Sequence, residues 1–381
     1  MIQKAVAQFA RSPDCESIHL PFFFTPDVST ARKGGLGKVV ELIRAIGRFL
    51  RIRAGGPVDL LLFPVGGPQR VPMIRDLLLL PAFLFLSRRV VLHFHAAGIA
   101  EQLENGPDRT LARMVAAIYR RAFAAVVMTE FNRRDPLTVG IKRVIVIPHR
   151  IDDAFDADLV RRKNDNAIRL LYVGHICADK GTPQLLEAFA RLRTMHPELE
   201  LELELELVGE CLPPFTEAQL NQVLDKLRIR SHVRVSGVLT GRAKAEAFGR
   251  ADLLVFPSVA PYESFGLVLT EAMSWSLPIV ATRWRGNFDV LTPDAGAVGF
   301  TVSSALTDDI GKALEEALRQ RANWEQLGKT NRSIFEARYR DNQTDQWLVG
   351  PILSLVRLTN ERPQDYGTTG QHGNGTLTSD R

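Results

Sequence analysis

The sequence has few cysteines and no hydrophobic segment long enough to cross a membrane. Its 381 residues include three cysteines, Cys15, Cys177 and Cys211, an odd number without the spacing of a metal cluster. Their scarcity excludes a disulfide scaffold and favours a reducing compartment. The longest apolar run, LLLLPAFLFL at 77–86, contains Pro81 and is too short for a bilayer span, which needs about 20 residues. Because no signal-peptide pattern is evident either, we expect a cytoplasmic protein.

The net charge of the chain is small, but its two parts carry opposite charge. The formal net charge is +5, from 48 basic and 43 acidic residues. Residues 1–150 hold 22 Lys and Arg against 11 Asp and Glu, or +11, which leaves 26 against 32, or −6, for the remainder. Such asymmetry indicates two domains with different partners. We expect the basic part to face an anionic membrane surface or phosphorylated ligands, or to carry its charge on solvated helix faces, and we expect no nucleic acid partner.

Short apolar runs alternate with amphipathic stretches along the chain, a pattern typical of parallel α/β architecture. In the first half we expect strands at 17–24, 58–65, 89–95, 124–129 and 143–148. In the second half we expect strands at 168–174, 201–209, 232–237, 252–258 and 277–282. Strand–helix–strand units are right-handed and have short loops, so each half is expected to form its own doubly wound, Rossmann-like sheet, with a cleft between the two.

The same pattern divides the chain into parts. The polar run RRKNDNA at 161–167 reads as a linker. The expected parts are an N-terminal Rossmann-like domain at 1–160, a C-terminal Rossmann-like domain at 168–335, terminal helices at 336–358 that pack back toward the N-terminal domain, and a disordered tail at 359–381.

The stretch PYESFGLVLTEAMSWSLPIVAT (261–282) carries the strongest functional signal. It holds two glutamates, Glu263 and Glu271, on either side of Gly266, between a strand and a helix. Parallel sheets collect ligands at the carboxyl ends of their strands, and the unsatisfied amides of a helix start attract anions. Amides around Phe265, Gly266 and Leu267 could cradle a phosphate, while the two carboxylates accept hydrogen bonds from hydroxyls on either side. A nucleotide-sugar has this arrangement of groups; the alternative is two solvated glutamates around a helix cap.

The neighbouring residues resemble the family-4 glycosyltransferases, which belong to group 1 and are retaining, nucleotide-sugar-dependent enzymes of the GT-B fold. Pro257-Ser258, Glu263, Phe265-Gly266-Leu267 and Glu271-Ala272, followed by LPIVAT, match the family's two-glutamate motif. LLYVGHICADKGTPQLLEAF, LELVGE, VSGVL and ADLLVFPS follow in the family's order. The resemblance covers about residues 168–303 specifically and the first half more weakly. It implies a GT-B fold and a transferase that needs no metal or other cofactor.

The resemblance also assigns roles to individual residues. In the family an Arg after Val-Gly and a Lys before Gly hold the diphosphate; the Lys corresponds to Lys180, but His175, after Gly174, stands where the Arg is expected. Either a cationic His175 binds the diphosphate more weakly, or Arg283 or Arg285 supplies the charge. By resemblance Glu263 contacts the donor sugar, Glu271 contacts ribose, and 285–287 line the sugar. The expected donor-binding residues are Gly174, His175, Lys180, Glu263, Phe265, Gly266, Leu267, Glu271 and Arg285.

The first half matches the family less closely. His95, at the end of RVVLHFH, corresponds to a family histidine near the acceptor, with His93 one pleat behind it. The family's Asn and Gly in the turn at 147–152 are replaced by His149 and Arg150. The chain opens with a helix, and the family's first strand and glycine loop have no evident counterpart, since the glycines at 34–35 follow what is normally the second strand. We therefore expect an N-terminal domain that lacks its first strand, and we hypothesise that the start is truncated or misassigned and that the activity is impaired.

The predicted function is retaining transfer of a sugar from a nucleotide-diphosphate donor to a saccharide or lipid-linked saccharide acceptor, in cell-surface polysaccharide or glycolipid synthesis. The predicted catalytic residues are His95, Lys180 and Glu263. The basic first half and the apolar run predict docking on the inner face of an anionic membrane, with a core helix as the other interpretation of that run. Two alternatives remain: a nucleotide-binding protein with impaired catalysis, and another GT-B nucleotide-sugar enzyme such as an epimerase. The base and sugar of the donor are left open.

Overall fold

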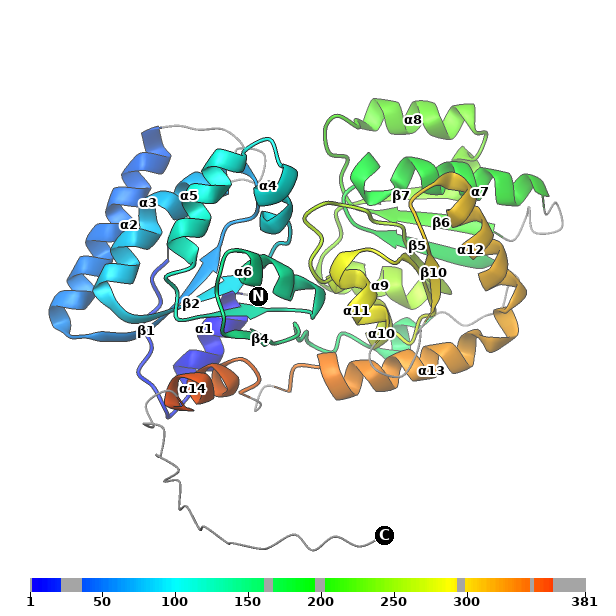
Figure 1. The fold of residues 1–381 in the computed structure, drawn as a ribbon. Coiled ribbons are helices and arrows are strands. Elements are labelled where there is room, and N and C mark those ends of the chain that lie inside the picture. Colours follow the sequence, from blue (N-terminus) through cyan, green and yellow to red (C-terminus); the bar gives the residue numbers. More distant parts are fainter. Residues whose placement is uncertain are drawn as a thin grey trace, which may run out of the picture. The chain divides into compact units, whose positions relative to one another are not determined.

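The structure is a computed structural model that describes residues 2–21, 36–160, 167–195, 203–292, 299–342 and 346–358. The chain divides into two compact units, one formed by 1–19 with 344–381 and the other by 20–343. The larger unit holds two parallel sheets with their helices (Figure 1). An α/β architecture built from two parallel sheets is therefore confirmed.

The first sheet has four described strands in chain order, β1-β2-β3-β4, all parallel. They are β1 Val58–Val65, β2 Ser87–Phe94, β3 Ala124–Val127 and β4 Val144–Val146. The helices of this part are α2 Leu36–Gly55, α3 Arg70–Leu86, α4 Ile99–Asn105, α5 Arg109–Tyr119 and α6 Arg134–Thr138. The expected strands from residue 58 onward are confirmed to within a few residues. Because these four strands follow chain order, the described part of this sheet contains no reversal of strand order.

The apolar run at 77–86 lies in α3, which packs beside α2 and α5 (Figure 1). Leu79, Leu80 and Phe83 are buried in the core of the first sheet. Leu78 and Phe85, in contrast, are 53% and 88% exposed. The run is therefore a helix with one buried and one exposed apolar face. None of the described helices is long and apolar enough to span a bilayer.

A buried carboxylate holds the sheet and helices of this part together. Asp76, fully buried in α3, accepts hydrogen bonds from the amide of Gly66 at 2.6 Å and from the hydroxyl of Tyr119 on α5. Arg75 forms an ion pair with it at 2.6 Å. Burial raises the pKa of the Asp76 carboxyl even though these partners favour its charged form. Buried polar groups of this kind stabilise a fold only when they are fully bonded, as here.

The second sheet has six described strands in the order β10-β9-β8-β5-β6-β7, all parallel. They are β5 Ile168–Val173, β6 Leu203–Val208, β7 Val233–Gly237, β8 Leu253–Phe256, β9 Ile279–Thr282 and β10 Phe300–Val302. The helices are α7 Thr182–Met195, α8 Glu217–Lys226, α9 Gly241–Arg250, α10 Leu267–Ser274, α11 Arg285–Leu291, α12 Thr307–Arg319 and α13 Trp324–Ile334. The strand order reverses between β5 and β8. This is the switch point at which doubly wound sheets bind ligands.

The smaller unit pairs the two ends of the described chain. Its helices are α1 Ile2–Arg11 and α14 Val349–Leu358. The amide of Leu348 donates to Gln8 at 3.2 Å, and Arg357 forms an ion pair with Asp14 at 3.0 Å. The expected N-terminal helix is confirmed, whereas residues 17–21 form no strand, so the expected strand at 17–24 is wrong over its described part. Residues 22–24, the glycines at 34–35, most of the linker at 161–167 and the tail at 359–381 lie outside the described residues.

Candidate active site at the carboxyl ends of β5 and β8

Lys180 and Glu263, 83 positions apart in the sequence, meet at the switch point. Lys180 ends the 3-10 turn Ala178–Lys180 after β5, and Glu263 lies in the loop after β8. The Lys180 Nζ is 2.5 Å from a Glu263 carboxylate oxygen, which also accepts a hydrogen bond from Ser258 at 2.8 Å. Each of the two charged side chains is 11% exposed. A buried charge pair of this kind is costly unless further bonds support it, which makes these two residues candidates for a functional site.

The residues next to Lys180 fix the approach of the chain to β8. Gly181 has a φ of +70°, and a Cβ there would lie 2.3 Å from the carbonyl oxygen of Pro257. Only glycine fits this combination of left-handed backbone and close approach. The Lys180 Nζ also lies 5.4 Å from the centre of the Phe256 ring and 5.8 Å from that of Tyr262, which provides cation–π attraction. The ammonium group is thus held in place before any ligand arrives.

His175 lies at the same edge but is less constrained. It follows Gly174, whose amide donates to the Val208 carbonyl at 2.9 Å. The His175 side chain is 42% exposed, and its Nδ1 is 3.7 Å from a carboxylate oxygen of Glu210. Its carbonyl accepts a hydrogen bond from the Tyr172 hydroxyl at 2.6 Å. His175 is therefore an exposed imidazole beside an acid, and it lacks the planar fork that an arginine would offer a diphosphate.

The loop after β8 ends at the amino end of α10, and Gly266 is the helix N-cap. Its φ is +68°, and a Cβ would lie 2.5 Å from the side-chain oxygen of Asn287. Phe265 is buried, whereas Leu267, the first helical residue, is 40% exposed. The free amides of this helix start lie in the same loop as Glu263, as an anion-binding start requires.

Glu271 lies one turn further along α10 and has a partner that the sequence did not reveal. Its carboxylate is 2.6 Å from the Nζ of Lys244 on α9, and both side chains are just under 30% exposed. Sequence reasoning missed Lys244 because only tertiary packing brings α9 beside α10. The lysine neutralises Glu271 without burying it, so its carboxylate remains accessible to hydroxyl groups.

Arg285 does not lie free for a phosphate. It has a φ of +47°, is the first residue of α11, and its Nη1 is 3.1 Å from a carboxylate oxygen of Glu101 on α4. The guanidinium also lies 5.7 Å from the Phe131 ring. Arg285 therefore joins the second sheet to the helices of the first. Arg283 is the other arginine considered as a replacement for the family's Arg. Its guanidinium carbon lies 4.4 Å from the centre of the Phe288 ring.

His95, the residue after β2, lies against the loop between β8 and α10. Its carbonyl accepts a hydrogen bond from the Ser264 hydroxyl at 2.7 Å. Its ring stacks on that of His149, with centroids 5.8 Å apart and planes at 16°, and His93 lies behind it at 4.0 Å. His149 in turn contacts Phe265 edge-on at 5.2 Å. The expected placement of His93 behind His95 is seen, and His149 packs between His95 and the loop that carries Glu263.

Burial makes the three imidazoles neutral. It lowers the pKa of His95 to about 4 and that of His149 to about 2, and it also takes the pKa of His93 well below its ordinary value. The mutual proximity of the rings acts in the same direction for His93 and His149. At neutral pH His95 therefore offers one ring N–H donor and one ring nitrogen acceptor, and no positive charge. Among the described residues, no group of three or more His, Cys, Asp or Glu side chains is placed to hold a metal ion.

Further polar residues of the first half reach the same loop, and sequence reasoning missed them. The Asn132 side-chain amide donates to the Ser264 carbonyl at 2.8 Å, and the Phe131 amide donates to Asp289 at 2.7 Å. Within the described part of the chain, the hydroxyl of Thr129 and both amide atoms of the fully buried Asn287 have no hydrogen-bond partner. Buried polar groups without partners are rare and need an explanation.

Residues 156–334 match the family model of glycosyl transferases group 1. A phosphatidyl-myo-inositol mannosyltransferase from Propionibacterium freudenreichii is 27% identical over 303 residues, which are 78% of this chain and 70% of that protein. An alpha-D-kanosaminyltransferase from Streptomyces kanamyceticus is 25% identical over 243 residues, or 60% of each chain. The matched region thus covers 70% of the first of these relatives and 60% of the second, and it covers 53% of a glycogen synthase from Mycobacterium tuberculosis.

Solved structures show the same fold. Sucrose-phosphate synthase from Thermosynechococcus elongatus superposes with a TM-score of 0.66 at 19% identity, over 92% of this chain and 85% of that one. An Anabaena protein solved with UDP and glucose superposes with a TM-score of 0.61 at 16% identity, over 89% and 84% of the two chains. The fold of the chain is GT-B, as the sequence predicted.

Proposed function

We propose that this chain, whose residues 156–334 match the family model of glycosyl transferases group 1, moves a sugar from a nucleotide-diphosphate donor to a saccharide or lipid-linked saccharide acceptor with retention of configuration. The observation that carries this proposal is the 2.5 Å contact of Lys180 with Glu263 at the switch point of the second sheet. Lys180, Glu263 and the start of α10 follow β5 and β8 at this switch point, where parallel sheets bind ligands, and Glu271 lies one turn further along α10. Relatives named as mannosyl- and kanosaminyltransferases, and a similar structure solved with UDP and glucose, support the same class of donor.

In the proposed reaction the bond from the anomeric carbon to the diphosphate oxygen breaks, and the acceptor oxygen bonds to that carbon on the same face of the sugar. The negative charge goes to the leaving diphosphate. Lys180 and the amides at the start of α10 stabilise that charge. Glu263 orients the sugar, and Glu271 accepts hydrogen bonds from the ribose. The leaving phosphate takes the proton of the acceptor hydroxyl. His95, which is neutral, positions the acceptor by hydrogen bonding, since a pKa of about 4 makes it a poor proton acceptor. We assign no step to a metal or other cofactor.

Replacement of Glu271 tests the donor site. Glu271 is partly exposed, so Glu271→Ala should fold, lose its ribose contact and bind the donor roughly tenfold more weakly. Affinity is measured by calorimetry with whichever of a panel of UDP-, GDP- and ADP-sugars gives the largest thermal shift. Glu246→Ala, which removes an exposed acid from α9, is the control. Equal affinity of both variants would contradict the proposed site.

The same panel separates transfer from the alternatives. Sugar transfer or slow donor hydrolysis, detected by chromatography, supports a transferase. A thermal shift without release of sugar would indicate a nucleotide-binding protein with impaired catalysis, for which His175 in place of an arginine is the motivating observation. Conversion of the donor into an isomer without an acceptor would indicate an epimerase.

We also propose a cytoplasmic location with docking on an anionic membrane through α3. The exposed Leu78 and Phe85 supply an apolar face, and Arg88 follows immediately with its side chain 71% exposed. Phe85→Glu should abolish flotation with phosphatidylglycerol vesicles, whereas Val238→Glu, at an exposed apolar residue just after β7, should not. Flotation that is equal with phosphatidylcholine vesicles, or absent for the wild type, would remove this part of the proposal.

A further inference from the structure

Helix α5 presents a row of three arginines on its outer face. Arg109, Arg113 and Arg120 are spaced by four and seven residues, which places them on one side of a helix with 3.6 residues per turn. Ala116 and Ala117 stand between Arg113 and Arg120. Because alanine side chains are short, the helix surface is hollow between the arginines.

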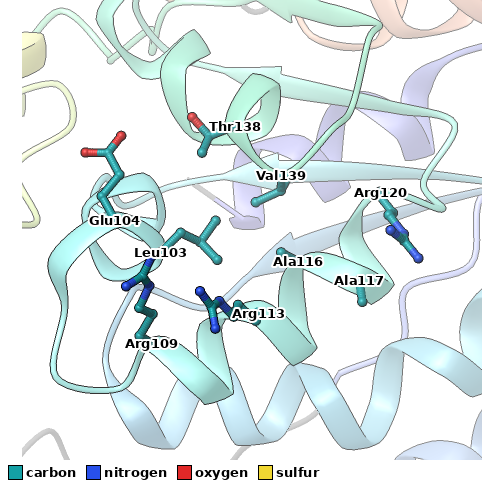
Figure 2. Close-up of a pocket in the computed structure, with 9 residues that line it drawn as sticks. All are labelled: Leu103, Glu104, Arg109, Arg113, Ala116, Ala117, Arg120, Thr138 and Val139. Atoms are coloured by element: carbon teal, nitrogen blue, oxygen red, sulfur yellow. The ribbon is translucent and has the colours of Figure 1, made fainter.

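This hollow is a pocket of about 400 Å³. Its remaining lining comes from the end of α4, with Leu103 and Glu104, and from the end of α6, with Thr138 and Val139 (Figure 2). Figure 2 shows Arg109 and Arg113 near Leu103 at one end and Arg120 at the other. The floor is thus apolar, with guanidinium groups at both ends and one hydroxyl on the wall.

The acids beside this pocket are already paired with other cations. Both carboxylate oxygens of Glu104 accept bonds from Arg134, at 2.6 and 2.8 Å. Asp108, which precedes Arg109, is 3.7 Å from the guanidinium of Arg70. Over the described ranges, Arg109, Arg113 and Arg120 form no ion pair, and each is exposed. Three positive charges therefore line the pocket, two at one end and one at the other, and none of the three is paired with an acid among the described residues.

The chemistry that fits this pocket is a phosphate group attached to a larger body. Guanidinium groups bind phosphate through two parallel N–H bonds, which ammonium groups cannot do. Arg113 and Arg120 are separated by about 10.5 Å along the helix axis, from the rise of 1.5 Å per residue. A phosphate held at one end leaves space for a sugar ring or an acyl segment over the two alanines.

We propose that the pocket on α5 is a second anion-binding site, which takes a phosphate-bearing ligand and is separate from the nucleotide-sugar site. The donor residues lie on the second sheet, whereas every residue of this pocket lies on helices of the first. The proposal does not rest on the transferase activity, because it concerns binding at these arginines alone.

The test measures binding of inorganic pyrophosphate by calorimetry. Lys180→Ala serves as the background, so that binding at the donor site is weakened. In this background Arg113→Gln and Arg120→Gln should each weaken pyrophosphate binding about tenfold or more, since each removes a charge-assisted contact. Arg121→Gln, which removes an equally exposed charge one residue beyond the pocket, should leave affinity unchanged. Circular dichroism confirms that the variants fold.

Vesicles separate the two sources of phosphate. Phosphatidylglycerol vesicles are floated with each variant and compared with phosphatidylcholine vesicles. Loss of pyrophosphate binding in Arg113→Gln, with flotation intact, identifies a soluble phosphorylated ligand. Loss of flotation in Arg113→Gln but not in Arg121→Gln identifies a lipid headgroup. If Arg113→Gln and Arg121→Gln behave alike in both arms, the pocket binds no phosphate and the proposal is overturned.

Discussion

At residue 175 the chain carries an imidazole where the family resemblance leads us to expect a guanidinium. The exposed ring of His175 lies beside Glu210, while Lys180 is buried and fixed by Glu263, Ser258 and two aromatic rings. Of these two side chains, Lys180 is therefore the fixed one, and it is the residue that we propose stabilises the diphosphate. Neutral histidine offers a single donor, whereas arginine offers five in a rigid fork.

We expect His175→Arg to bind the nucleotide-sugar donor about tenfold more tightly, because a permanent charge and a planar fork would then face the diphosphate. The measurement is calorimetric titration with the donor that stabilises the wild type most. His19→Arg adds the same charge to the smaller unit and should not change affinity. A tightening common to both variants would point to overall charge instead of a contact at residue 175.

The histidine cluster makes stability depend on pH. The pKa values of about 4 for His95 and about 2 for His149 lie below the ordinary 6.5, so below pH 6.5 the unfolded chain binds more protons than the folded one. The free energy of unfolding should therefore fall as pH falls from 6.5 toward 4, by about 1.4 kcal/mol per pH unit for each such group. His149→Asn should show a shallower fall, and His19→Asn should keep the wild-type slope. Urea unfolding at several pH values measures both, and identical slopes in all three proteins would rule the cluster out.

At the scale of elements, the amino end of α10 depends on the backbone conformation of Gly266, and it is the helix start that we propose binds the diphosphate. The chain adopts a positive φ at Gly266 where the loop after β8 turns into α10. Asn287 at the start of α11 fills the room beside that glycine. The start of α10 is therefore packed between the loop that follows β8 and the helix α11 that follows the neighbouring strand β9.

Gly266→Ala should destabilise the protein by about 1–3 kcal/mol, since a Cβ is strained at this φ and meets Asn287 at 2.5 Å. Gly311→Ala is the matched change: it lies inside α12 with nothing within 4 Å of the new Cβ, and should stabilise by up to about 1 kcal/mol. Chemical denaturation compares the two. Equal effects of the same sign would show that residue 266 has no special backbone requirement.

At the scale of the whole molecule, residues of the first half contact the loop between β8 and α10. Ser264 donates to the carbonyl of His95 and accepts, through its own carbonyl, a bond from Asn132. Arg285 pairs with Glu101. The contacts of Ser264 join the end of β2 at His95, which we propose positions the acceptor, to the residue beside Glu263. Transfer requires both reactants to be held within a fraction of an ångström.

Asn132→Ala should lower the turnover number roughly tenfold and leave donor affinity unchanged, because it loosens the placement of His95 relative to the loop without removing a donor contact. Steady-state kinetics and donor titration separate the two effects. Asn105→Ala, an exposed asparagine at the end of α4, is the control. A loss of donor affinity equal to the loss of turnover would place Asn132 in the donor site itself.

The sequence by itself determined the alternation of strands and helices from residue 58 onward, the GT-B fold and the stretch from 257 to 282 that forms the loop and helix of the candidate site. The alternation follows from apolar periodicity and turn residues. The GT-B fold, in contrast, was implied by the resemblance of the motifs at about 168–303 to a known family. The strand expected at 17–24 failed over 17–21 because a short apolar run does not decide between strand and loop without partners to pair with.

Only the tertiary structure decided which side chains meet. It paired Lys180 with Glu263 and Glu271 with Lys244, turned Arg285 toward Glu101, stacked His149 on His95, and left the arginines of α5 around a pocket. The physical reason is that contacts between residues far apart in the chain depend on strand order and helix packing. Local sequence does not encode either.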